Sequence, residues 1–343
     1  MCAYEAKPGG KGAFPGPVWL FVRLKRSWSS LVARLLWLGF YKTRKLCQLV
    51  PLFMFPPLNA SARSHPILRF KYLRGYYLIR GLTLRQRASC FRHHYRRLRS
   101  LLPRGLLHKI LSGSLVLHEL SVDGHCFSIT MGLSQRDCIQ EGELSLNLYV
   151  DGEIVFVLSF TIVPGSVVES EVEEILLITR IQGAQGRYSQ ISLATKVLHD
   201  VAPRALLLSA LKGIALAFGI GHMSGVCASR QTSYCEGRAA HYQRAYDAFL
   251  AGSGFVRNPA GFYLAALPFE EKPLACIKRG HKLRTKEKRL FKQQIQFACA
   301  SFFGKVADLA LASSGAAWQT GALRSEPAGH APAVSQNRHN SAA

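Results

Sequence analysis

Two Asp-Gly pairs, Asp123–Gly124 and Asp151–Gly152, most restrict the fold of this 343-residue chain. They separate stretches in which apolar residues alternate with polar ones or form short apolar runs: residues 115–121, 125–133, 144–150 and 154–163. Such stretches predict strands, and Asp-Gly tolerates the positive φ angles of a tight hairpin turn. We therefore expect two antiparallel hairpins, followed by a further strand at 175–181.

After this strand the pattern changes to an alternation of helices and strands. Helical patterns cover residues 192–200, 203–219 and 241–251, and short apolar strands cover 222–229 and 261–268. Hairpins that lead into alternating helices and strands predict an α/β (α+β) domain. We expect a mixed, largely antiparallel sheet with covering helices.

The segment before the hairpins has a helical pattern. Thr83 and Gln86 have the spacing of a capping box, and apolar residues then recur every three or four positions as far as Leu102. Arginines mostly fall off this stripe and predict a surface for an anionic partner: Arg85, Arg92, Arg96, Arg97 and Arg99. A basic helical region should therefore precede the α/β domain and pack against it.

Charge is distributed unevenly over a net charge of +24. Residues 1–110 hold 22 Lys/Arg and one acidic residue. Residues 111–277 hold 11 basic and 16 acidic residues, and residues 278–305 hold 9 basic residues and 1 acidic residue. With composition, this predicts five parts: a basic, partly disordered extension (1–60), an Arg-rich helical region (61–110), the α/β core (111–277), a basic helix (278–305) and a disordered tail (306–343).

The N-terminal apolar stretches are interrupted by cations, so we expect neither a secretory signal nor a transmembrane segment. Residues 17–56 fit two interpretations: a basic amphipathic segment on an anionic membrane, or a helix that packs on the body of the protein. Nine scattered cysteines indicate free thiols and a cytoplasmic location, peripheral to the inner membrane in the first interpretation. No Cys/His spacing is typical of a metal site, and we expect none.

The turn after the strand at 175–181 is the main candidate site. Glycines allow close approach of a ligand, and the following helix presents amides to an anion. The predicted ligand-binding residues are Arg180, Gln182, Gly183, Gln185, Gly186 and Arg187. A gap between the end of this strand, near Arg180, and the strand at 222–229 would favour such a site. The alternative is a tight connection without a ligand.

This turn resembles the pyrophosphate loop of the GNAT acyl-CoA acyltransferases, Gln/Arg-x-x-Gly-x-Gly/Ala. Arg180 and Gly183 match, whereas Gln185 replaces the second small residue and Gly186 comes one position late. The resemblance implies a GNAT-like order of elements, acyl-CoA as co-substrate and Tyr246, or alternatively Tyr242, as the proton donor to the thiolate. Glu143 is a candidate general base, although an acid at a strand start also suits solvation.

A set of short motifs occurs in one order, including HHY at 93–95, EGEL at 141–144, RIQG at 180–183, Tyr246–Asp247 and LPFEEK at 267–272. Together they resemble the VirK/YbjX family of Gram-negative bacteria over about residues 60–295. The resemblance implies a bacterial protein of virulence, envelope or stress physiology, without a known reaction. The residues after Tyr246–Asp247 depart from the family pattern.

Two functional hypotheses follow. The first is an acyl-CoA-dependent acyltransferase with its ligand at residues 180–187. The second is a non-catalytic adaptor that binds anionic membrane, or less favourably nucleic acid, through the basic segments 85–104 and 278–292.

Overall fold

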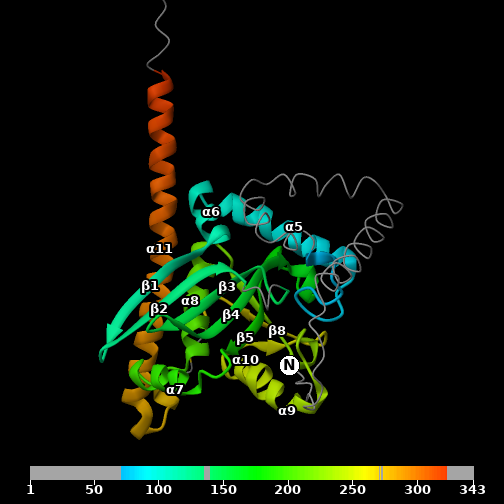
Figure 1. Cartoon of the computed structure of the whole chain (residues 1–343), viewed down its shortest axis with the longest axis vertical. Helices are drawn as coiled ribbons and strands as arrows, with labels where there is room; N and C mark the ends of the chain where they lie inside the picture. Colours follow the sequence, from blue (N-terminus) through cyan, green and yellow to red (C-terminus); the bar gives the residue numbers. More distant parts are fainter. Residues whose placement is uncertain (1–70, 135–139, 270, 272, 323–343) are drawn as a thin grey trace, which may run out of the picture.

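The fold is described by a computed structural model for residues 71–134, 140–269, 271 and 273–322, with backbone alone for 305–322. The N-terminal extension and the aromatic, cationic segment 17–56 lie outside the described residues. Figure 1 shows an eight-stranded sheet covered by helices. In chain order, the main elements before the parallel strand pair are α5 (Leu84–Leu101), α6 (Arg104–Ser112), β1 (Ser114–Val122), β2 (His125–Leu133), β3 (Leu144–Val150), β4 (Glu153–Pro164) and β5 (Glu174–Gly183).

The predicted hairpins are confirmed. Asp123 and Gly124 have φ angles of 51° and 76°, and Asp151 and Gly152 have φ angles of 52° and 81°. A left-handed pair of this kind matches the twist of antiparallel strands. β1 to β5 accordingly form an antiparallel meander in which each strand pairs with the next.

A helical crossover makes the sheet mixed. The chain leaves β5 through α7 (Tyr188–Val197) and α8 (Pro203–Ala217), then returns as β6 (His222–Val226) parallel to β5. β8 (Phe262–Ala266) and β7 (Val256–Arg257) complete the order β1-β2-β3-β4-β5-β6-β8-β7. The predicted fold class, a mixed and largely antiparallel α/β sheet with covering helices, is confirmed.

Helix α5 begins at the predicted capping box, in which Thr83 and Gln86 bond to each other's backbone amides. Its buried face includes Phe91, Tyr95 and Leu98, and the helix packs on β4. The expected basic helix before the core is therefore present, and its apolar stripe is the face that packs.

On α8, Gly213 lets α11 (Lys282–Ala322) approach at the backbone. A Cβ atom at Gly213 would collide with the carbonyl oxygen of Gln296. Phe291, Ile295 and Cys299 of α11 are buried along this contact. The helix is longer than the sequence pattern predicts.

Some boundaries differ from the expected ones. α7 begins at Tyr188 rather than at residue 192, and the expected helix at 241–251 is built from three pieces. These pieces are α9 (Ala239–Tyr242), a π-helical turn (Gln243–Asp247) and α10 (Ala248–Gly252). Periodicity of 3.6 does not reveal a π turn, since the apolar spacing across it changes by one residue.

Candidate functional site

β5 and β6 pair over only a short parallel stretch. Their register joins Leu176, Leu177 and Ile178 to Met223, Ser224 and Gly225, and β6 ends at Val226 whereas β5 continues to Gly183. A shift in the β4–β5 register lies at the same level, between Ser159 and Phe160. The last residues of β5 therefore extend beyond the pairing with β6.

The π-helical turn bonds to the end of β5 and to the chain after β6 through consecutive side chains. The Tyr246 hydroxyl accepts a hydrogen bond from the Ile181 amide at 3.5 Å, and the Asp247 carboxylate accepts from the Ala228 amide at 3.3 Å. One residue thus binds β5 and the next binds the chain just after β6. Burial raises the pKa of Tyr246 above its ordinary value, and the nearby Glu141 carboxylate adds to the effect, so the phenol is protonated at neutral pH.

Arg180 lies beside this turn with an incomplete set of partners. Its Nε atom lies 3.3 Å from Glu141 Oε2 and donates to Gln182 Oε1 at 3.1 Å. Its Nη1 atom is buried and has no hydrogen-bond acceptor among the described residues. An unpaired buried donor of a charged group is costly, so the site is suited to receive an acceptor.

Further unpaired polar groups lie next to Arg180 on the sheet. The register places Ser145 opposite Ser159 and Ser159 opposite Arg180, with Thr130 opposite Asn147 in the adjoining row. Residues directly opposite on one face have Cβ atoms about 5 Å apart. In the part of the chain that the structure describes, the hydroxyls of Thr130, Ser145 and Ser159 and the Asn147 Oδ1 atom are buried without partners. Arg180 therefore ends a row of buried groups that can bind water or a polar ligand.

The glycine turn after β5 is partly self-bonded. The Ala184 amide donates to the Val155 carbonyl and the Arg187 amide to the Ala184 carbonyl. Within the described part of the chain, the Gln185 and Gly186 amides have no acceptor, and α7 has no side-chain cap. Gly183 serves packing, since a Cβ there would lie 2.7 Å from Ile191 Cδ1.

The two arginines of the turn do not converge. Arg187 lies 2.5 Å from Glu153 on the β3–β4 hairpin, whereas Arg180 pairs with Glu141 near the π-helical turn. Each guanidinium is thus balanced by a carboxylate distant in sequence. Tyr188, the first residue of α7, is 81% exposed.

Glu143 lies at the centre of a buried cluster. Lys71 Nζ lies 2.6 Å from its carboxylate, Tyr95 donates to it at 2.6 Å, and Tyr77 donates to its other oxygen. Glu143 and Tyr77 are fully buried. Burial lowers the pKa of Lys71 despite the attraction of Glu143, and burial together with the Glu143 charge raises the pKa values of both phenols.

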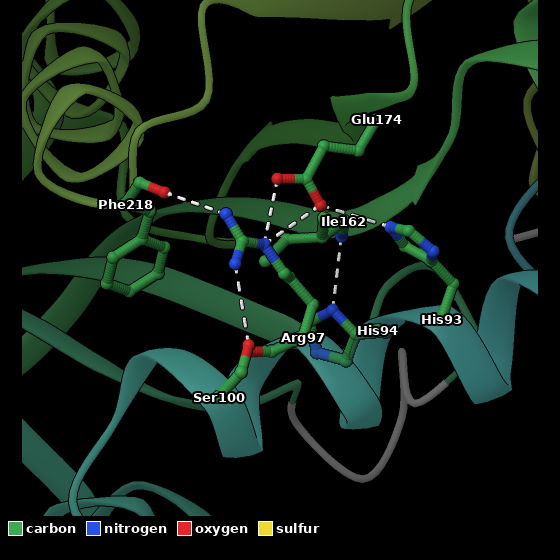
Figure 2. Close-up of polar contacts among 7 residues, drawn as sticks. All are labelled: His93, His94, Arg97, Ser100, Ile162, Glu174 and Phe218. Carbon is green, nitrogen blue, oxygen red and sulfur yellow. Dashed lines mark hydrogen bonds and ion pairs between the residues drawn. The ribbon is translucent and has the colours of Figure 1, made fainter.

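The HHY motif fixes α5 to the sheet through three consecutive side chains. Figure 2 shows His93 and Arg97 on the Glu174 carboxylate, at 3.2 Å and 2.8 Å, and His94 Nδ1 accepting from the Ile162 amide at 3.1 Å. Tyr95 binds Glu143 as described. Burial lowers the pKa of His94 well below its ordinary value, so its imidazole is neutral. Within the described residues, no three His, Cys, Asp or Glu side chains are grouped as metal ligands.

The predicted anionic-partner arginines have different environments. Arg97 is committed to Glu174 and to the Phe218 carbonyl, whereas Arg85, Arg96 and Arg99 are exposed. Partial burial and the adjacent charge of Arg96 lower the pKa of Arg92. The surface of α5 therefore retains cations, but Arg97 contributes to the fold.

Sequence reasoning missed Lys71, Tyr77 and Asp247 as members of these clusters. Lys71 is followed by Tyr72 and Leu73, and a lysine among apolar residues is a weak signal of burial. Asp247 belongs to the noted Tyr-Asp pair, but its partner at Ala228 cannot be read from spacing.

Comparisons with known proteins give one family and one distant structure. No curated protein matches the chain. Among solved structures, a mutant of a cAMP-binding acyltransferase from Mycobacterium smegmatis aligns at 11% identity with a TM-score of 0.25, over 62% of this chain and 60% of that protein. A likeness this low carries no argument about function.

No helix in the described part of the chain has the length and apolar character needed to cross a bilayer. A family model described as a protein of unknown function, DUF535, matches residues 28–292. This span contains the HHY, EGEL, RIQG and LPFEEK motifs. The chain therefore belongs to the DUF535 family, which is the VirK/YbjX family that its motifs resemble.

Proposed function

We propose that this protein binds an acyl-CoA-type ligand where β5 leaves β6 and transfers its acyl group. The Nη1 atom of Arg180 carries the proposal, because it is a buried donor without an acceptor among the described residues. Arg180 lies on the part of β5 beyond the pairing with β6, next to Ile181, whose amide bonds to the Tyr246 hydroxyl. A guanidinium that still lacks an acceptor is suited to a carbonyl or phosphate oxygen of a ligand.

The turn between β5 and α7 supplies the phosphate-binding part of the proposal. The Gln185 and Gly186 amides and the uncapped first turn of α7 offer donors to an anion. The exposed ring of Tyr188 is positioned to stack on the base of a nucleotide. Arg187 supports this part only by leaving Glu153, since the two side chains are paired.

Tyr246 is the proposed proton donor. Its raised pKa keeps the phenol protonated, and within the described residues its hydroxyl hydrogen has no acceptor. In the reaction the acceptor's nucleophilic atom bonds to the acyl carbon and the thioester C–S bond breaks. Tyr246 gives its proton to the departing thiolate, and the proton that the acceptor loses returns through solvent to the Tyr246 phenolate. Glu143 is buried, so we assign it a positioning role: it anchors residues 141–143, from which Glu141 reaches Arg180.

A thermal-shift measurement with acetyl-CoA and longer acyl-CoAs tests the proposal. At 100 times the dissociation constant, a ligand stabilises the folded state by about 2.7 kcal/mol, which is a clear rise in Tm. We expect Arg180→Ala to abolish the rise and Arg187→Ala to reduce it. Each rise is measured against the variant's own ligand-free Tm, because Arg180→Ala also leaves Glu141 unpaired.

Arg284→Ala is the matched control, since Arg284 pairs with Asp200 at an exposed site elsewhere. Its ligand-induced rise should equal that of the unaltered protein. The absence of any rise with acyl-CoAs, or a rise unchanged in Arg180→Ala, would contradict the proposal. A rise that persists in Tyr246→Phe while acyl transfer is lost would support the proton-donor role.

A second proposal keeps the adaptor hypothesis for α5, because Arg85, Arg96 and Arg99 are exposed on one helix. Co-sedimentation with anionic vesicles or DNA should be strong at low salt and fall steeply as salt rises. Replacement of these three arginines by glutamine should remove the binding. Binding that is unchanged by salt, or equal on neutral vesicles, would contradict this second proposal.

A further inference from the structure

Helix α11 carries exposed apolar side chains at a spacing of seven residues. Leu283, Leu290 and Phe297 are 70%, 49% and 73% exposed. Seven residues make nearly two helical turns, so these side chains form one line along the helix, about 21 Å from end to end. Phe291, Ile295 and Cys299 lie on the other side, buried toward α8. The exposed line therefore faces away from the body of the protein.

Cations accompany this line. Lys282 and Lys286 are exposed and have no carboxylate partner within the described residues. Arg284 instead pairs with Asp200, and Arg289 and Lys292 pair with Glu271. Lys278, Arg279 and His281, just before the helix, are also exposed. Arg284, Arg289 and Lys292 are thus paired with carboxylates, whereas Lys282 and Lys286 on the outward face are not.

The presence of apolar side chains and unpaired lysines on one face of α11 restricts the kind of partner that can bind there. A second copy of α11 would bring two identical rows of lysines together, and the positions between the apolar residues, such as Glu287 and Gln294, are polar rather than coiled-coil apolar. Nucleic acid would satisfy the lysines but not the leucines and the phenylalanine. An anionic bilayer surface takes both, because lysines meet lipid phosphates while apolar side chains enter the interface.

We propose that the outward face of α11, formed by Lys282, Leu283, Lys286, Leu290 and Phe297, docks on an anionic lipid bilayer. The helix lies along the surface and inserts its three apolar side chains. This face shares no residue with the acyl-CoA-type site, and Figure 1 shows the first turns of α11 and helix α5 on different sides of the molecule. The inference therefore stands whether or not the proposed function holds.

Vesicle binding by the full chain tests this inference. The probe is a vesicle of phosphatidylcholine with 30% phosphatidylserine, compared with pure phosphatidylcholine, in about 0.1 M salt. We expect the triple variant Leu283→Ser, Leu290→Ser, Phe297→Ser to lose at least about tenfold in affinity for anionic vesicles. Lys282→Gln and Lys286→Gln should each lose about fivefold.

Matched controls separate this surface from general effects. Val256→Ser removes an apolar side chain that is equally exposed, 73%, on β7, and Lys109→Gln removes an exposed lysine of α6. Both should bind as the unaltered protein does. A Phe297→Trp variant adds a local signal: its emission should shift to the blue on anionic vesicles and be quenched by brominated lipid, after subtraction of the unaltered protein's spectrum.

Several results would overturn the inference. Affinity unchanged in the triple variant shows that another part of the chain holds the vesicle. Equal binding to neutral vesicles would contradict the role of the lysines. Emission of the Phe297→Trp variant that brominated lipid does not quench would contradict insertion. A dimer of the unaltered protein that becomes monomeric in the triple variant, without a change in vesicle binding, assigns the face to a second copy.

Discussion

Glu143 shows how much one side chain can organise at the scale of a residue. Its carboxylate receives an ammonium group and two phenols, from Lys71, Tyr77 and Tyr95, in a fully buried setting. These partners come from the segment before α5 and from α5 itself. Glu143 therefore joins the N-terminal helical region to the start of β3. Because the site is buried, its partners could not bond to bulk water if this carboxylate were removed.

Glu143→Gln should reduce the free energy of unfolding by about 3–5 kcal/mol, because a buried ammonium group then loses its counter-charge. Urea denaturation measures the change. The double variant Glu143→Gln, Lys71→Met should recover part of the loss, since it removes the uncompensated charge. A double variant as unstable as the sum of its single variants would show that the two charges do not act as a pair.

Lys212 is a second residue whose environment has a measurable effect. Its ammonium group lies 3.6 Å from the centre of the Phe269 ring, and burial lowers its pKa to about 8, with the Lys292 charge acting in the same direction and Glu271 opposing it. Between pH 8 and about 10.5 the folded state binds fewer protons than the unfolded state. The contribution of Lys212 to stability should therefore increase with pH across this window.

Urea denaturation between pH 7.5 and 10 measures this trend. In Lys212→Met the rise should be absent, because the titrating group is gone while a side chain of similar length still covers Phe269. The comparison uses the difference between the two proteins at each pH, so that other titrating groups cancel. A constant difference over the whole range would contradict the assigned pKa.

At the scale of elements, the backbones of α8 and α11 are in close contact at Gly213, which has no side chain. Gly213 lies in the middle of α8, where glycine costs about 1 kcal/mol relative to alanine in helix propensity. The close approach of the Gln296 carbonyl explains why it is nevertheless suited to this position. Packing here overrides propensity.

Gly213→Ala should therefore lower the free energy of unfolding by about 1–3 kcal/mol instead of raising it, since the two backbones must separate. Gly105→Ala is the control, because Gly105 is helical in α6 and has open space around its Cα. That variant should be neutral or slightly stabilised. Thermal or urea unfolding of both variants gives the sign directly, and a stabilised Gly213→Ala would refute the backbone contact.

The sequence predicts elements whose causes are local. Asp123–Gly124, Asp151–Gly152 and the Thr83 capping box each act over a few residues, and each forms as expected. Arg180 and Arg187 were expected to share one ligand, but the fold brings a different carboxylate to each, from Glu141 and Glu153. Such partners are fixed by strand register, which no spacing in one sequence reveals.

At the scale of the whole molecule, the uneven charge distribution along the sequence is reflected in ion pairs between segments. Carboxylates of the acidic middle segment hold the basic helices on either side: Glu174 binds His93 and Arg97 of α5, and Glu271 binds Arg289 and Lys292 of α11. Within the described residues, the acidic middle segment therefore supplies the counter-charges that hold α5 and α11.

The π-helical turn at residues 243–247 also affects access to the proposed ligand site at the end of β5. A π-helical turn holds more residues than an α-helical turn, and adjacent residues of an α-helix differ by about 100° around the axis. If residues 243–247 rewound as ordinary α-helix, Tyr246 and Asp247 would rotate away from Ile181 and Ala228 together. One change of winding would then break both hydrogen bonds, the one at the end of β5 and the one just after β6.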